Sequence, residues 1–87
     1  MKIFLTKAAK KDIAKINPKL RKRFFDKFEE LEFHPNPIAM AKRINRCVHG
    51  TYRLRIADKY RILFSVKNSE IIIGRIGPRD KIYKANY

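Results

Sequence analysis

The sequence is poor in acidic residues and cysteine, and it has no long apolar run. Eight Asp and Glu residues stand against 22 Lys and Arg, which leaves a formal net charge of +14. The single cysteine, Cys47, permits no internal disulfide, and the longest aliphatic stretch is Ile71 to Ile73. A membrane-spanning helix needs roughly 20 apolar residues, and the apolar segment at the N-terminus is too short for a secretory signal. We therefore expect a cytoplasmic protein without a membrane span.

Length and charge narrow the class of partner. A chain of 87 residues has room for one domain and buries roughly 60% of its unfolded surface on folding. A charge of +14 repels itself in the folded state and calls for an acidic or polyanionic partner. Nucleic acid is favoured, because each phosphate neutralised by Lys or Arg releases condensed counterions. An acidic protein or an anionic membrane surface would satisfy the same charge.

The first third of the sequence predicts one strand and two helices. Residues 1–5 form a short apolar segment suited to a strand, and Thr6 can cap a helix that runs to about Ile16. The pair Asn17-Pro18 signals the start of a second helix, which has an apolar stripe and stops near His34.

The rest of the sequence predicts a loop followed by three strands. Residues 35–50 lack periodicity and read as a connecting loop, with a turn of helix around residues 39–42. Hydrophobicity then alternates with a period of two in residues 52–56 and 60–66, and residues 70–76 are apolar on both faces and so predict a central strand. The predicted fold is α+β in the order β-α-α-β-β-β, with two N-terminal helices packed on one face of a four-stranded, mainly antiparallel sheet.

Strand alternation predicts a cluster of arginines. If the apolar residues of the second and third strands face the helices, Arg53, Arg55 and Arg61 emerge together on the opposite, solvent-facing side. Planar guanidinium groups match phosphate oxygens two at a time. We therefore expect a phosphate backbone to bind this face.

The C-terminal segment adds further candidates. After the sheet ends, Arg79 and Tyr83 can fold back over the same face, and Arg75 and Lys81 complete the basic residues expected to contact RNA. The ring of Tyr83 can stack on an unpaired base, or it can close the hydrophobic core. Both interpretations remain open.

The sequence contains no pattern that indicates a cofactor or a metal site. Cys47 and His49 lie two residues apart without a second pair of ligands. There is no Gly-rich phosphate loop, carboxylate dyad or Ser/His/Asp set. We expect no metal, no cofactor and no small-molecule ligand.

Four segments, taken together, resemble the C-terminal half of RelE/ParE superfamily toxins. They are residues 50–56, 60–64, 75–79 and 82–83. The resemblance implies that residues 1–87 form a single RelE/ParE-like toxin domain of a type II toxin–antitoxin system. It also implies a cognate acidic, RelB-like antitoxin that wraps the toxin and forms an oligomer with it. RelE-like members cut mRNA in the ribosomal A site.

The resemblance also implies catalytic roles. The positions of Arg53, Arg55, Arg61, Arg79 and Tyr83 match the basic and tyrosine positions of RelE-like toxins. In RelE-like cleavage the 2′-hydroxyl of the substrate attacks the adjacent phosphate, and arginines can orient the backbone and neutralise charge but cannot transfer protons.

The chain departs from its relatives at two positions. They carry a Lys on the strand that here holds Arg53 and Arg55, or a His where this chain has Pro78. Either Tyr83 and ribosomal groups complete the site, or the chain cleaves weakly or not at all. A ParE-like toxin that inhibits DNA gyrase and a non-catalytic RNA-binding module are the alternative functions.

Overall fold

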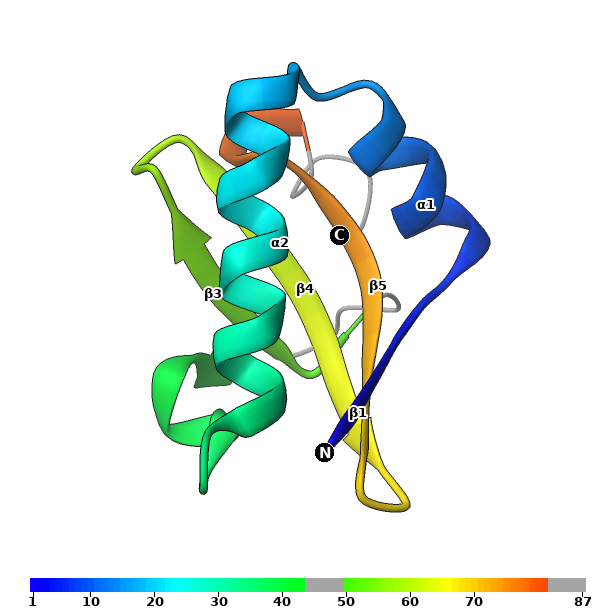
Figure 1. Cartoon of the computed structure of the whole chain (residues 1–87), viewed down its shortest axis with the longest axis vertical. Coiled ribbons are helices and arrows are strands. Elements are labelled where there is room, and N and C mark those ends of the chain that lie inside the picture. The colour runs from blue at the N-terminus through cyan, green and yellow to red at the C-terminus, as the bar shows by residue number, and fades with distance from the viewer. Residues whose placement is uncertain (44–49, 82–87) are drawn as a thin grey trace.

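The computed structural model describes residues 1–43 and 50–81 and is an α+β fold (Figure 1). The elements in chain order are β1 (Lys2–Leu5), α1 (Lys7–Ala14), α2 (Pro18–Phe33), the 3-10 helix η1 (Pro37–Met40), β2 (Lys42–Arg43), β3 (Tyr52–Ile56), β4 (Tyr60–Lys67) and β5 (Glu70–Pro78).

The strands form one sheet of five in the order β1-β5-β4-β3-β2. β1 runs parallel to β5, and the other neighbours are antiparallel. The prediction of four strands was one too few, because β2 lies in the segment predicted to be a loop. This strand has two residues, Lys42 and Arg43, which pair with Arg53 and Tyr52 of β3. Two residues are too short a segment for alternation to reveal, so only the pairing with β3 defines the strand.

Both helices begin where their capping residues predict. The Thr6 hydroxyl accepts a hydrogen bond from the backbone N–H of Ala9 at 3.2 Å, and the Asn17 side chain accepts one from that of Leu20 at 2.9 Å. α1 ends at Ala14, slightly before the predicted end, and α2 ends at Phe33 with His34 as its cap. Neither helix, within the described ranges, is long and apolar enough to span a membrane.

Both hairpin turns lie between the strands that the sequence predicts. Ala57 and Asp58 have φ of 50° and 58°, and Asn68 and Ser69 have φ of 51° and 62°. Asn68 and Ser69 form a two-residue turn between the paired residues Lys67 and Glu70. A turn with two successive positive φ values has the same twist as the strands that it joins.

One face of the sheet carries the core, as predicted. α2 lies across this face in Figure 1, and α1 lies beside β5. The core side chains of the helices meet those of the strands at this face, and Tyr52 packs against them with its ring 5.6 Å from that of Phe64. The buried hydrophobic strand residues of this core are Leu54, Ile56, Ile62, Phe64, Ile71, Ile73 and Ile76. Leu63, which alternates with them on β4, is buried outside this cluster.

A β-bulge explains why β5 is apolar at irregular spacing. Phe64 pairs with Ile73 and Leu63 pairs with Arg75, so Gly74 is the extra residue between them. The bulge shifts the alternation by one residue. Ile73 and Ile76 can therefore both face the core although they are three positions apart. β5 lies inside the sheet, between β1 and β4.

Beyond the bulge, the outer edge of β5 is covered by side chains instead of by a strand. β1 pairs with β5 only as far as Ile73. The Thr6 hydroxyl donates a hydrogen bond to the carbonyl oxygen of Gly74 at 2.9 Å, and the Asp12 carboxylate accepts one from the backbone N–H of Ile76 at 3.0 Å. These bonds satisfy groups that an open edge would leave unpaired.

Candidate functional site

The predicted arginines meet on the sheet face opposite the helices. Arg53 and Arg55 alternate with core residues on β3, and Arg55 pairs directly with Arg61 of β4. These side chains line a depression of about 240 Å³, hereafter the arginine pocket, together with Lys42 of β2 and Met40 and Ala41 before it. The arginine pocket therefore joins residues from β2, β3 and β4.

Among the residues that the structure describes, the lining of the arginine pocket contains four cationic side chains and no carboxylate. Like charges held close together are unfavourable unless an anion lies among them. Guanidinium groups donate parallel hydrogen bonds to two oxygens of one phosphate, and an ammonium group adds a compact point charge. This chemistry suits the binding of a phosphodiester and the neutralisation of charge that develops on it.

Arg61 is buried, so its predicted exposure at the surface was wrong. Only 4% of the residue is accessible to solvent. Its Nη1 atom donates hydrogen bonds to the carbonyl oxygens of Asp58 at 2.7 Å and Tyr60 at 2.9 Å. The turn before β4 has positive φ at Asp58, and it presents these carbonyl groups to the guanidinium. The side chain of Arg61 is therefore held in place at the bottom of the arginine pocket. The neighbouring Arg55 is exposed to solvent.

Lys42 is the site residue that the sequence analysis missed. It pairs with Arg53 across β2 and β3, and it lines the arginine pocket. The family relatives carry their lysine on the strand of Arg53 and Arg55, whereas this chain brings one from the neighbouring strand. The only signal in the sequence is a basic pair, Lys42-Arg43, in a segment without periodicity.

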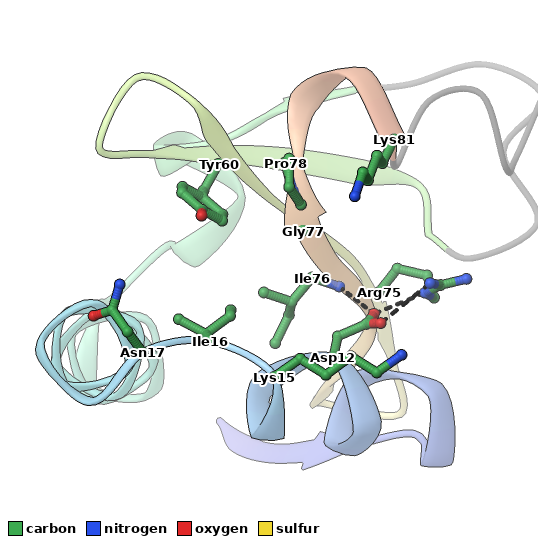
Figure 2. Close-up of a pocket in the computed structure, with 10 residues that line it drawn as sticks. All are labelled: Asp12, Lys15, Ile16, Asn17, Tyr60, Arg75, Ile76, Gly77, Pro78 and Lys81. Atoms are coloured by element: carbon green, nitrogen blue, oxygen red, sulfur yellow. Dashed lines mark hydrogen bonds and ion pairs between the residues drawn. The ribbon is translucent and has the colours of Figure 1, made fainter.

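Arg75 turns away from the arginine pocket toward α1. Its Nε and Nη2 atoms donate to the two carboxylate oxygens of Asp12 at 2.7 and 3.1 Å (Figure 2). These hydrogen bonds, aided by the charge of Asp12, raise the pKa of Arg75, while burial acts in the opposite direction. Arg75 does not line the arginine pocket, and the predicted contact of Arg75 with RNA stays a prediction.

Arg79 and Lys81 do not line the arginine pocket. Arg79 is exposed, and its backbone N–H donates to the carbonyl oxygen of Lys59 at 2.7 Å, which keeps the chain after β5 beside the turn between β3 and β4. Lys81 lines a second depression. Tyr83 lies outside the described residues, and its predicted role stays a prediction.

The second depression, hereafter the interhelix hollow, has a volume of about 470 Å³ and lies where the α1–α2 junction meets β4 and β5. Figure 2 shows Tyr60 and Lys81 on one side of it and Ile16 and Lys15 on the other, with Ile76 between them. The Asp12–Arg75 pair forms part of its wall.

No group of three or more Cys, His, Asp or Glu side chains that could hold a metal ion occurs within residues 1–43 and 50–81. Cys47 and His49 lie outside these ranges.

Three solved toxin–antitoxin complexes contain chains of similar fold. RelBE2 from Mycobacterium tuberculosis matches with a TM-score of 0.75 and 23% identity over 90% of each chain. RelB-RelE from Methanococcus jannaschii matches with a TM-score of 0.74 and 26% identity over 94% of this chain and 96% of that one. Intact RelBE from E. coli matches with a TM-score of 0.69 and 18% identity over 88% of this chain and 94% of that one. The shared fold is therefore RelE-like.

A search of curated protein sequences gives no match to this chain. The family model that describes the ParE toxin of the type II toxin–antitoxin system parDE matches residues 3–83. Apart from Lys2, the first residue of β1, that range includes every described element of the fold and the described lining of the arginine pocket. The chain therefore belongs to the ParE toxin family, within the RelE/ParE superfamily, and is a toxin of a type II toxin–antitoxin system.

Proposed function

We propose that this toxin is a RelE-like, ribosome-dependent endoribonuclease that cleaves mRNA in the A site and so inhibits translation. The observation that carries the proposal is the arginine pocket, where four cationic side chains from three adjacent strands meet within residues 1–43 and 50–81. This arrangement of positive charges would not strengthen the binding of an uncharged or cationic ligand. It would stabilise a scissile phosphate, whose negative charge increases in the transition state.

Three arginines provide orientation and charge neutralisation. The 2′-oxygen of the substrate forms a bond to the adjacent phosphorus, and the bond from phosphorus to the 5′-oxygen breaks, leaving a cyclic phosphate and a 5′-hydroxyl. Arg61 is fixed by two carbonyl groups, so it needs little reorganisation when charge develops. Arg53 and Arg55 approach the phosphate from the facing strand.

Lys42 can act as the proton donor, a role that the arginines cannot fill. A guanidinium does not release its proton at neutral pH, whereas an ammonium group can donate one. In the proposed reaction the Lys42 ammonium protonates the departing 5′-oxygen, and the proton of the 2′-hydroxyl passes to solvent or to a ribosomal group. Lys42 thus takes the place of the lysine that β3 lacks.

The small arginine pocket fits a ribosome-dependent reaction. With a volume of about 240 Å³, it cannot by itself hold an mRNA in one conformation. The ribosome positions the codon, and the toxin adds charge and a proton donor. The expected target is therefore cytoplasmic mRNA undergoing translation.

The proposed inhibitor is a cognate, acidic, RelB-like antitoxin that forms an oligomer with the toxin. The similar solved structures are toxin–antitoxin complexes, and a net charge of +14 favours an acidic partner. A segment that folds as it binds can cover a large part of a small domain. Covering the arginine pocket is sufficient to block mRNA.

The test is toeprinting of mRNA on translating ribosomes with purified toxin, which should give new mRNA ends inside A-site codons, while free RNA is cut poorly. Lys42→Arg keeps the charge but removes the proton donor, and it should reduce cleavage about 100-fold, because general acid catalysis typically contributes 10²–10⁴-fold. Arg43→Lys, on the next residue of β2 and outside the arginine pocket, is the matched control and should cleave normally.

Two outcomes would contradict this proposal. Normal cleavage by Lys42→Arg would remove Lys42 from proton transfer. Intact mRNA together with loss of DNA supercoiling would favour the second candidate, a gyrase-inhibiting toxin, to which the match with the ParE family model lends support.

A further inference from the structure

The interhelix hollow is a second cationic site, separate from the arginine pocket. The two depressions share none of the lining residues that the structure describes. The hollow is the larger of the two, at about 470 Å³, and it lies where the α1–α2 junction meets β4 and β5. The proposed cleavage reaction makes no use of it.

The charge of the hollow is suited to an anion. Lys15 and Lys81 contribute two ammonium groups, and no ion pair joins either one to a partner in the described part of the chain. Asp12, the single acidic residue among the described residues of the wall, is already held by Arg75 through two hydrogen bonds. A carboxylate that enters the hollow can therefore pair with the ammonium groups of Lys15 and Lys81, and the repulsion from Asp12 is reduced by its ion pair with Arg75.

The hollow also has an apolar part that a phosphate backbone would not use. Ile16, Ile76 and Pro78 contribute to its wall, and the ring of Tyr60 lies beside them with its hydroxyl directed into the space (Figure 2). A site that combines an apolar wall with a few polar groups binds a side chain and fixes its orientation. Nucleic-acid phosphates need the charges alone.

We propose that the interhelix hollow binds an acidic peptide segment, with an apolar side chain inserted against Ile16 and Ile76 and flanking carboxylates held by Lys15 and Lys81. The hydroxyl of Tyr60 offers a further hydrogen bond to the peptide. This inference rests on the antitoxin partnership proposed above, and it assigns to the antitoxin an anchor point distant from the arginine pocket. Inhibition then combines two sites, one that blocks mRNA and one that holds the inhibitor on the toxin.

The test uses synthetic probes and the full chain labelled at the isoleucine δ1-methyl groups. A blocked pentapeptide with a central leucine and two glutamates on each side should shift the methyl signals of Ile16 and Ile76. A second peptide with glycine in place of leucine should bind about fivefold more weakly, because it lacks the apolar anchor. Pentauridylate should leave both methyl signals unchanged.

Matched variants separate the hollow from the general positive charge of the chain. Lys15→Gln should weaken binding of the leucine peptide about threefold or more, whereas replacement of Lys11, an exposed residue of α1 outside the hollow, by Gln should have a much smaller effect. Both variants should cleave mRNA on ribosomes normally. Failure of cleavage in the unmodified toxin would therefore count against the proposed function and not against this site.

Three results would overturn the inference. Equal affinity for the leucine and glycine peptides would mean that there is no apolar anchor. Equal weakening by Lys15→Gln and Lys11→Gln would mean that the peptide follows net charge alone. Saturable methyl shifts with pentauridylate, without shifts from the peptide, would assign the hollow to RNA.

Discussion

Replacing Arg61 with alanine should destabilise the toxin, although the sequence places this arginine on a solvent-facing strand surface. Only 4% of the residue is accessible to solvent, and its Nη1 atom donates hydrogen bonds to two carbonyl oxygens at 2.7 and 2.9 Å. A hydrogen bond made by a charged group contributes about 1.5–3 kcal/mol. The two bonds share one nitrogen, and the substitution also relieves repulsion within the arginine pocket. We therefore expect a loss of about 2–4 kcal/mol in the free energy of unfolding.

The matched control is Arg55→Ala. Arg55 is the cross-strand partner of Arg61, it lines the same pocket, and its loss changes the net charge by the same amount. Because Arg55 is exposed, its replacement should change stability by no more than about 0.5 kcal/mol. The difference between the two variants therefore isolates the buried hydrogen bonds of Arg61.

The measurement is urea denaturation of the two variants and the unmodified chain at one salt concentration. If the free energies of unfolding of Arg61→Ala and Arg55→Ala agree within about 0.5 kcal/mol, the bonds to Asp58 and Tyr60 do not hold the turn and the reasoning is refuted. If they differ as expected, loss of toxicity in Arg61→Ala would not by itself assign Arg61 to RNA. Arg55→Ala would then be the cleaner functional test.

Two further predictions concern stability and are checked by thermal unfolding. Asp12→Ala should lower the free energy of unfolding by about 2–3 kcal/mol, because it leaves the backbone N–H of Ile76 without an acceptor and removes both hydrogen bonds to the Arg75 guanidinium. Asp12→Asn should lower it by about half as much, because the amide oxygen of the asparagine still accepts the hydrogen bond from Ile76. Equal losses would show that the backbone bond contributes little. Gly50→Ala should cost about 2 kcal/mol or more, because its Cβ would lie 2.6 Å from the backbone nitrogen of Phe64. Gly77→Ala, with nothing within 4 Å of its Cβ, should be nearly neutral, and a Gly50→Ala protein as stable as Gly77→Ala would contradict the clash.

The sequence alone determined the features that depend on neighbouring residues. Helix starts follow from side chains that cap a backbone N–H a few positions away, as at Thr6 and Asn17. The face on which Arg53 and Arg55 lie follows from the strict alternation of a strand. The turn at Asn68 follows from residue types that tolerate positive φ. Each of these is decided within a few residues, so the fold class and the arginine face could be predicted.

Tertiary structure decided what these residues do. Lys42 joins the arginine pocket only because β2 pairs with β3, and the guanidinium of Arg75 turns toward α1 because Asp12, 63 residues earlier in the chain, accepts its hydrogen bonds. Arg61 is buried because its guanidinium turns back onto the carbonyl groups of the preceding turn. Alternation fixes the side of the sheet from which a side chain leaves. The hydrogen-bond partner of a long, flexible Lys or Arg side chain depends on groups that folding brings close to it. No local sequence pattern predicts those groups.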